Sequence, residues 1–149
     1  MAQIDVLAGR PIGTVDRRIF GSVAEHLGRC VYGGVLDEGS PGGLRADVLA
    51  AVRDLGVTNV RWPLRAGPGQ EPGRFGTGEF ITWCAAAGVE PVLALDMGTG
   101  TLDEALAWVE YCNGSDSYWA GRRRASGYAE PIGVRYWGLG REMCRRPAQ

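Results

Sequence analysis

The chain has 149 residues, a formal net charge of −1 and 45% hydrophobic residues, a composition typical of one globular domain and not of a disordered segment. Sixteen Lys and Arg against 17 Asp and Glu give no electrostatic reason to expect nucleic acid or a membrane surface as a partner. The length excludes a complete eight-stranded α/β barrel, which takes about 250 residues. The N-terminus has no signal-peptide pattern, so we expect a cytoplasmic protein.

Hydrophobic periodicity predicts strands and helices in strict alternation. Apolar residues at Leu44, Val48 and Val52 share one helical face, and Thr101 with Glu104 forms a capping box before a helix. The continuous apolar run 91–95 is typical of a strand buried on both faces of a parallel sheet. The predicted strands are 18–27, 57–62, 91–95 and 134–139, and the predicted helices are 44–55, 77–87 and 101–112.

This alternation predicts a parallel sheet with right-handed crossovers. On the third helix, an inward stripe is expected at Leu102, Ala105, Leu106 and Val109. Two segments are expected to be irregular, the Gly- and Pro-rich 64–76 and the polar 114–131. The second contains the arginine run 122–124, which we interpret as a solvated face without a function.

The four cysteines do not form a C-x-x-C pair, so the sequence gives no support for a zinc site. Cys84 and Cys112 fall on apolar helix positions and are expected in the core. We expect neither a metal nor a cofactor.

Ligands of parallel α/β folds bind beyond the carboxyl ends of the strands. The strand-end residues are Glu25-His26, 61–63, 96–98 and 140–142. Carboxylates and arginine bind sugar hydroxyls, and an aromatic face covers the C–H surface of a sugar. A protonated carboxyl can donate its proton to the leaving oxygen of the glycosidic bond. Each residue also has a structural interpretation: Glu25 and Glu142 as solvated loop acids, His26 as a structural histidine, and Trp62 as a side chain packed under a loop.

The segment 96–100, DMGTG, follows a strand and precedes a helix, as a nucleotide-binding loop would. It departs from G-x-G-x-x-G because the last position is Asp103, and acids in the first helical turn repel phosphate. A nucleotide site is therefore the weakest of the hypotheses.

Several strings resemble glycoside hydrolase family fifty-one, the α-L-arabinofuranosidases, and they occur in the family's order along nearly the whole chain. They are EHLGRCVYGG at 25–34, VRWP at 60–63, FGT at 75–77, GTGT at 98–101, WVEYCNG at 108–114 and YWGLG at 136–140. The resemblance implies a retaining glycosidase on an eight-stranded α/β barrel with an attached β-sandwich. This chain is then a half barrel of about four parallel strands over residues 1–149, with 1–16 as a leading strand or linker.

The resemblance also assigns site residues. Glu142 matches the general acid/base at the end of the fourth strand, Glu25 matches a substrate-binding glutamate, and Arg61 and Trp62 belong to a motif at the sugar pocket. Arabinose-containing oligosaccharides and polysaccharides are the expected partners, with no nucleic acid and no membrane.

The departures from the family are equally specific. Leu64 follows the VRWP string where the family continues with a long stretch, which indicates an internal deletion. Arg141 replaces the asparagine before the acid/base, and no residue here matches the nucleophile of a later strand. Three hypotheses follow: an arabinofuranosidase whose chain has doubtful activity alone, a non-catalytic carbohydrate-binding remnant, and a half barrel that assembles with itself through open sheet edges.

Overall fold

The computed structural model describes residues 2–37, 39–64, 67–68 and 73–140. Four parallel strands form one sheet in the order β1-β2-β3-β4. The strands are β1 (Gly21–Val23), β2 (Asn59–Pro63), β3 (Glu90–Leu95) and β4 (Tyr136–Leu139). The helices are α1 (Ala46–Asp54), α2 (Thr77–Ala87), α3 (Leu102–Asn113) and α4 (Tyr118–Ala125), with 3₁₀ turns η1 (Arg17–Phe20) and η2 (Pro41–Gly43). The predicted parallel α/β architecture is confirmed.

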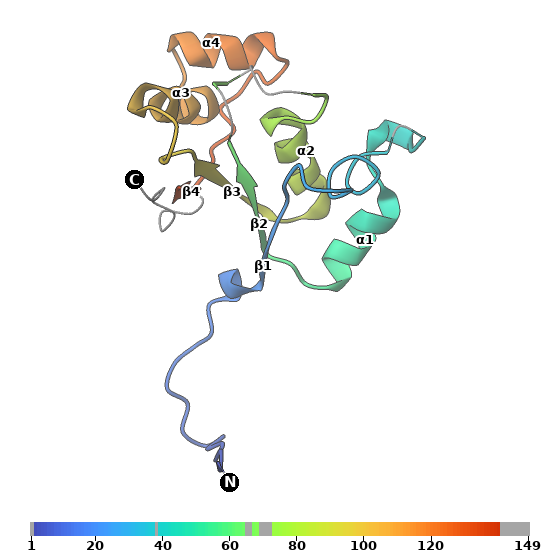
Figure 1. Cartoon of the computed structure of the whole chain (residues 1–149), viewed down its shortest axis with the longest axis vertical. Coiled ribbons are helices and arrows are strands. Elements are labelled where there is room, and N and C mark those ends of the chain that lie inside the picture. Colours follow the sequence, from blue (N-terminus) through green and yellow to red (C-terminus); the bar gives the residue numbers. More distant parts are fainter. Residues whose placement is uncertain (1, 38, 65–66, 69–72, 141–149) are drawn as a thin grey trace, which may run out of the picture.

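Helix pairs cover the sheet, with α1 packed on α2 and α3 packed on α4 (Figure 1). Residues 2–16 contain neither helix nor strand and extend away from the folded body (Figure 1). The described residues of 64–76 before α2 form no helix or strand, as their glycines and prolines predict.

The core lies between the sheet and α2 and α3. Val60 and Leu93 from the strands meet Phe80 and Trp108 from the helices, and all four are buried. Cys84 and Cys112 are buried in the same cluster, which confirms their prediction as core residues. Burial raises the pKa of the Cys84 thiol to about 12.

The first predicted strand, 18–27, is wrong at both ends, because β1 covers only Gly21–Val23. Beyond Val23 the chain turns, and the Leu27 N–H donates to the Glu25 carbonyl at 2.7 Å. The Asp16 carboxylate accepts a hydrogen bond from the Arg18 backbone N–H, and this cap starts the 3₁₀ turn η1 in place of extended chain. Strand β1 therefore begins only at Gly21, where it pairs with Asn59 of β2.

The predicted inward stripe of the third helix is right for Ala105, which is buried, and wrong for its other three members. Leu102, Leu106 and Val109 are exposed, whereas Trp108 and Cys112 are buried. The buried face of the helix is the one that carries its aromatic rings, because burial of a Trp or Tyr ring removes more apolar area from water.

The segment predicted as a polar connection contains α4, which Ser117 caps by accepting a hydrogen bond from the Ala120 N–H. The solvated interpretation of the arginine run is wrong for Arg123, which is fully buried. Its guanidinium donates to the carbonyls of Tyr111, Gly114 and Tyr128 at 2.9, 2.7 and 3.2 Å. Arg123 thus joins the C-terminus of α3 to the turn after α4.

Candidate functional site

The carboxyl ends of β1 and β2 meet at one edge of the sheet because the two strands are parallel neighbours. Val23 pairs with Arg61 in the register, and the Ala24 N–H donates to the Arg61 carbonyl at 2.9 Å. The Arg61 side chain then reaches Glu25, two residues beyond the end of β1. Arg61 Nη2 donates to Glu25 Oε1 at 3.0 Å, with both side chains partly buried, at 31% and 21% exposure.

Aromatic rings pack against one another around Trp62, the residue that follows Arg61 in β2. Trp62 is 2% exposed and stacks on Phe80 at 5.2 Å between centroids, with Phe75 edge-on at 5.4 Å. His26 is exposed at the rim, and its ring lies 5.1 Å from the ring of Trp62. These contacts give Trp62 a packing role, so its direct contact with a sugar stays a prediction.

Asp96 follows β3 at the same edge and organises its own loop. Its carboxylate accepts hydrogen bonds from the backbone N–H groups of Gly98 and Thr99 and from the Thr99 hydroxyl. These bonds lower the pKa of Asp96, the side-chain bond from Thr99 contributing most. Gly100 is required there because a Cβ would lie 2.4 Å from the Asp96 carbonyl oxygen. Asp96 therefore stabilises its loop, and its carboxylate has few acceptor positions left for a ligand.

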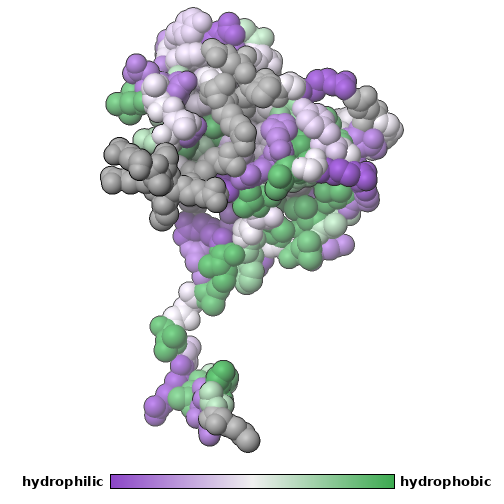
Figure 2. All heavy atoms as spheres, in the orientation of Figure 1, coloured by the Kyte–Doolittle hydropathy of each residue, from purple (hydrophilic) through white to green (hydrophobic). Residues whose placement is uncertain are grey.

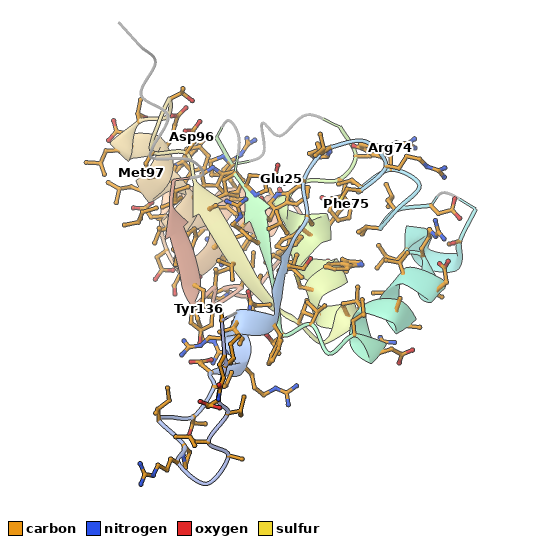
Figure 3. All side chains as sticks on the ribbon, turned by 60° about the horizontal axis from the view of Figure 1, so that its bottom comes forward. Glu25, Arg74, Phe75, Asp96, Met97 and Tyr136 are labelled. Atoms are coloured by element: carbon orange, nitrogen blue, oxygen red, sulfur yellow. The ribbon has the colours of Figure 1, made fainter. Side chains whose placement is uncertain are left out.

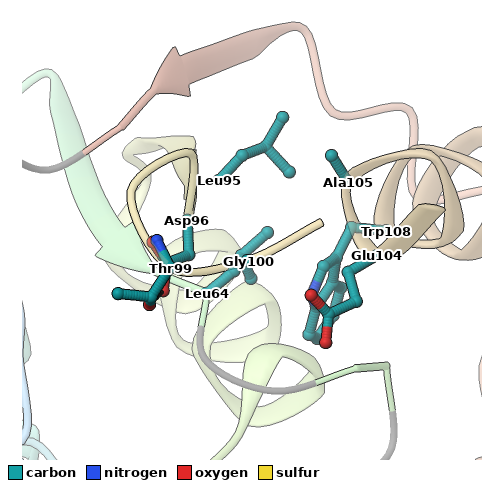
Figure 4. A pocket seen from close by; sticks show the side chains of 8 residues that line it. All are labelled: Leu64, Leu95, Asp96, Thr99, Gly100, Glu104, Ala105 and Trp108. Atoms are coloured by element: carbon teal, nitrogen blue, oxygen red, sulfur yellow. Dashed lines mark hydrogen bonds between the residues drawn. The ribbon is translucent and has the colours of Figure 1, made fainter. Parts of the chain in front are cut away.

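A cavity of about 160 Å³ opens beside this loop (Figure 4). It is lined by Leu64, Leu95, Asp96, Thr99, Gly100, Glu104, Ala105 and Trp108. Glu104 is held by the capping box predicted from the sequence, because it accepts the Thr101 N–H at 2.7 Å. In Figure 3, Glu25 lies between Asp96 on one side and Arg74 on the other, whereas Tyr136 lies at the opposite end of the sheet.

One site feature was not found by sequence reasoning: Tyr32 joins two loops at the rim. Its hydroxyl accepts a hydrogen bond from the Arg74 N–H at 3.1 Å, and its ring lies 5.7 Å from His26. Gly73 has a φ of +91°, and a Cβ there would meet the Tyr32 hydroxyl at 2.3 Å. The only sequence signal was the place of Tyr32 within the EHLGRCVYGG string.

Glu142 and Arg141 lie outside the described residues, so the predicted acid/base stays a prediction. After β4 the described residues end at Gly140, whose N–H donates to the Leu95 carbonyl at 3.0 Å.

Across the described ranges, no group of three His, Cys, Asp or Glu side chains is placed to hold a metal ion. None of the helices in those ranges is long and apolar enough to cross a bilayer.

Residues 53–149 match the family model described as the alpha-L-arabinofuranosidase 1 domain. The chain belongs to this family. It is 43% identical to alpha-L-arabinofuranosidase C of Emericella nidulans, over 94% of this chain and 34% of that protein. It is 38% identical to the intracellular exo-alpha-(1->5)-L-arabinofuranosidase of Bifidobacterium longum, over 89% of this chain and 29% of that protein.

Solved structures give the same result. The alpha-L-arabinofuranosidase of Thermotoga maritima, an arabinose complex, superimposes with a TM-score of 0.76 and 45% identity over 87% of this chain and 33% of that chain. AbfB, a family 51 alpha-L-arabinofuranosidase of Bifidobacterium longum, gives a TM-score of 0.79 and 39% identity over 90% of this chain and 32% of that chain. The resemblance to family fifty-one and the partial α/β barrel are confirmed.

The chain spans about a third of the length of these relatives. The match to the Emericella nidulans relative extends over 169 residues, more than the 149 of this chain, so that relative holds residues in the matched range that this chain lacks. This agrees with an internal deletion, whose place after the VRWP string stays a prediction.

Proposed function

We propose that this chain supplies the part of an α-L-arabinofuranosidase pocket that binds the terminal arabinofuranosyl residue of arabinose-containing oligosaccharides and polysaccharides. The ion pair between Glu25 and Arg61 supports this proposal most directly. It sets acceptor oxygens and N–H donors side by side at the carboxyl edge, where ligands of α/β barrels bind. Vicinal sugar hydroxyls act as both donors and acceptors, so they complement such a pair.

The chemistry proposed for these residues follows from the retaining mechanism. Two carboxyl groups roughly 5–5.5 Å apart are needed, one as nucleophile and one as general acid/base. Glu142 is proposed to protonate the glycosidic oxygen and then to take a proton from the attacking water. Glu25 and Arg61 orient the sugar hydroxyls, and the buried Trp62 ring supports His26 through their ring contact.

The nucleophile of the family has no counterpart in this chain, so the 149-residue chain is proposed to bind arabinofuranosides and to hydrolyse them at a negligible rate by itself. Covalent catalysis divides one difficult displacement into two easier ones, and that route needs the second carboxylate. The test is a paired assay of the purified chain with an aryl α-L-arabinofuranoside, measuring release of the aryl group and, separately, binding by NMR titration. Binding without turnover is expected. Turnover that disappears in Glu142→Gln would contradict it, and an absence of binding would overturn the proposed function.

A second candidate, a half barrel that becomes complete by self-assembly, is favoured by the sheet edges. β1 and β4 are the edges of the described sheet, and β1 is exposed along its length. Ile19, Phe20 and Val23 on and before β1 are about half exposed or more, and Leu139 of β4 is exposed. Figure 2 shows hydrophobic residues gathered on the lower face of the body. Pairing β4 of each copy with β1 of the other would close eight strands by two-fold symmetry.

We infer a role in L-arabinose metabolism within the cytoplasm. The support is that one relative, from Bifidobacterium longum, is named as an intracellular enzyme that acts on α-(1->5)-linked L-arabinofuranosyl residues. Fractionation of the native cells with an antibody to the chain tests this location.

A further inference from the structure

We propose that Asn113 and Gly114 form a site of spontaneous deamidation, and that the packing of α3 against the segment before β4 controls the rate of the reaction. The reaction consumes only water and needs no partner protein. This inference is independent of the proposed function, because it concerns the joint between α3 and β4 and not the sugar site.

The first observation is the sequence at the end of α3. The chain has two asparagines, Asn59 and Asn113, and only Asn113 precedes a glycine. Glycine has no side chain, so the backbone nitrogen of Gly114 can approach the side-chain carbonyl carbon of Asn113 without steric hindrance. The β-branched Val60 hinders the same approach after Asn59. Asn113 is also exposed, so water can reach its amide.

The reaction balances without an oxidant or a reductant. The backbone nitrogen of Gly114 loses its proton and bonds to Cγ of Asn113, the Cγ–Nδ2 bond breaks, and the side-chain nitrogen leaves as ammonia with that proton. Water then opens the resulting cyclic imide. Cleavage of the imide bond at Cγ leaves an aspartate at position 113, whereas cleavage at the backbone carbonyl carbon leaves an isoaspartate, whose main chain runs through Cβ and Cγ.

The second observation is that the fold holds both reacting groups apart. Asn113 Nδ2 donates to the Val134 carbonyl at 2.9 Å, and Asn113 Oδ1 accepts the Val134 N–H at 2.8 Å. The attacking N–H of Gly114 donates instead to the Glu110 carbonyl at 2.8 Å. Arg123 Nη1 holds the Gly114 carbonyl at 2.7 Å. Deamidation therefore requires local opening of this joint.

The product would weaken the same joint. The carbonyl of Val134, a residue that is 4% exposed, would lose its Nδ2 donor and face a carboxylate. A negative charge on the last residue of α3 also opposes the helix dipole. Because β4 begins at Tyr136, two residues after Val134, the modification would loosen the attachment of this edge strand to α3.

The experiment follows the full chain in mildly alkaline buffer, with and without denaturing urea. Mass spectrometry of the digested chain measures how fast aspartate and isoaspartate appear at position 113. The reaction is expected to be at least about tenfold faster in urea, where the joint is open. Asn59 is the internal control and is expected to stay unmodified in both. Equal rates in the two conditions would overturn the control by the fold, and an unmodified Asn113 in urea would overturn the site.

Two variants separate the fold from the chemistry. Arg123→Ala frees the Gly114 carbonyl and is expected to raise the rate in buffer about fivefold or more, whereas Arg122→Ala, at an exposed position, should keep the wild-type rate. Gly114→Ala is measured in urea, where folding has no part, and is expected to slow the reaction about tenfold because of its added methyl group. A wild-type rate in Arg123→Ala would overturn the gating, and a wild-type rate in Gly114→Ala would overturn the chemistry.

Asn113→Asp carries the aspartate product and tests its consequence. Its thermal midpoint at neutral pH is expected to fall by roughly 3 °C or more. Ser115→Asp, which adds the same charge at an exposed position beyond the end of α3, is the matched control and should keep the wild-type midpoint. Equal midpoints of wild type and Asn113→Asp would overturn the loosening of β4.

Discussion

The Arg61 guanidinium lies 3.0 Å from the Glu25 carboxylate and joins the carboxyl ends of β1 and β2. A second arginine–glutamate pair, Arg135 with Glu90, joins β4 to β3 at the opposite end of the sheet. The two pairs have the same chemistry, but only the first lies at the carboxyl ends of the strands, the edge at which ligands of α/β barrels bind. Position in the fold, and not the ion pair as such, makes Glu25 and Arg61 the candidate site.

Arg123 is expected to stabilise the fold more than its neighbours in the arginine run. Arg123→Ala removes three hydrogen bonds and leaves buried carbonyls without donors, so the free energy of unfolding should fall by roughly 3 kcal/mol. Urea denaturation measures the change. Arg122→Ala, at an exposed position of the same helix, is the control and should stay within about 0.5 kcal/mol of wild type. Equal losses in the two variants would show that α4 does not depend on this guanidinium.

The Asp96 loop predicts a pH dependence of stability. The folded-state pKa of Asp96 lies below its ordinary value of about 3.9, so the unfolded chain binds the proton first as pH falls. Its contribution to stability is present above about pH 4 and is lost as pH falls through the folded pKa. Asp96→Asn should therefore be less stable than wild type at neutral pH and approach it in acid.

Thermal unfolding of both proteins between pH 7 and pH 3 measures this convergence. Asp54→Asn, at the exposed last residue of α1, is the control and should run parallel to wild type. A constant difference between wild type and Asp96→Asn across the whole range would mean that the Asp96 charge has no part in holding the loop.

Much of the fold could be predicted from the sequence because local signals and burial agree. Helix α2 has its predicted bounds, since Phe80 and Cys84 share an inward face and Gly88 ends the helix at a φ of +76°. Helix α4 was missed because its surface is polar. It depends on Arg123, whose partners lie in α3 and in the following turn, so no local periodicity reveals it.

The candidate site could be predicted from the sequence only where it depends on the order of the strands. Adjacent parallel strands bring Glu25 and Arg61 together, and this follows from strand order alone. The burial of Trp62 depends on Phe75 and Phe80, which come from the next loop and helix. The contact between Tyr32 and Arg74 joins two irregular loops, for which the sequence has no periodic signal.

The open edges of the sheet predict self-association. Light scattering of the purified chain at tens of micromolar should give twice the 16.0 kDa chain mass. Val23→Lys places a charge on the exposed edge strand β1 and should shift the chain to monomer. Val109→Lys, at an exposed apolar position of α3, is the control and should keep the wild-type mass. A monodisperse wild-type monomer would contradict the assembly.

The most direct test of the proposed sugar site is a comparison of two glutamates in matching ion pairs. Glu25→Gln and Glu90→Gln each remove one carboxylate that faces an arginine, at opposite ends of the sheet. NMR titration with an arabinofuranosyl oligosaccharide measures the dissociation constant of each variant. Loss of a charge-assisted hydrogen bond to the sugar should weaken binding about tenfold or more in Glu25→Gln. The account predicts that loss in Glu25→Gln with wild-type affinity in Glu90→Gln; equal affinities of the two variants would contradict it.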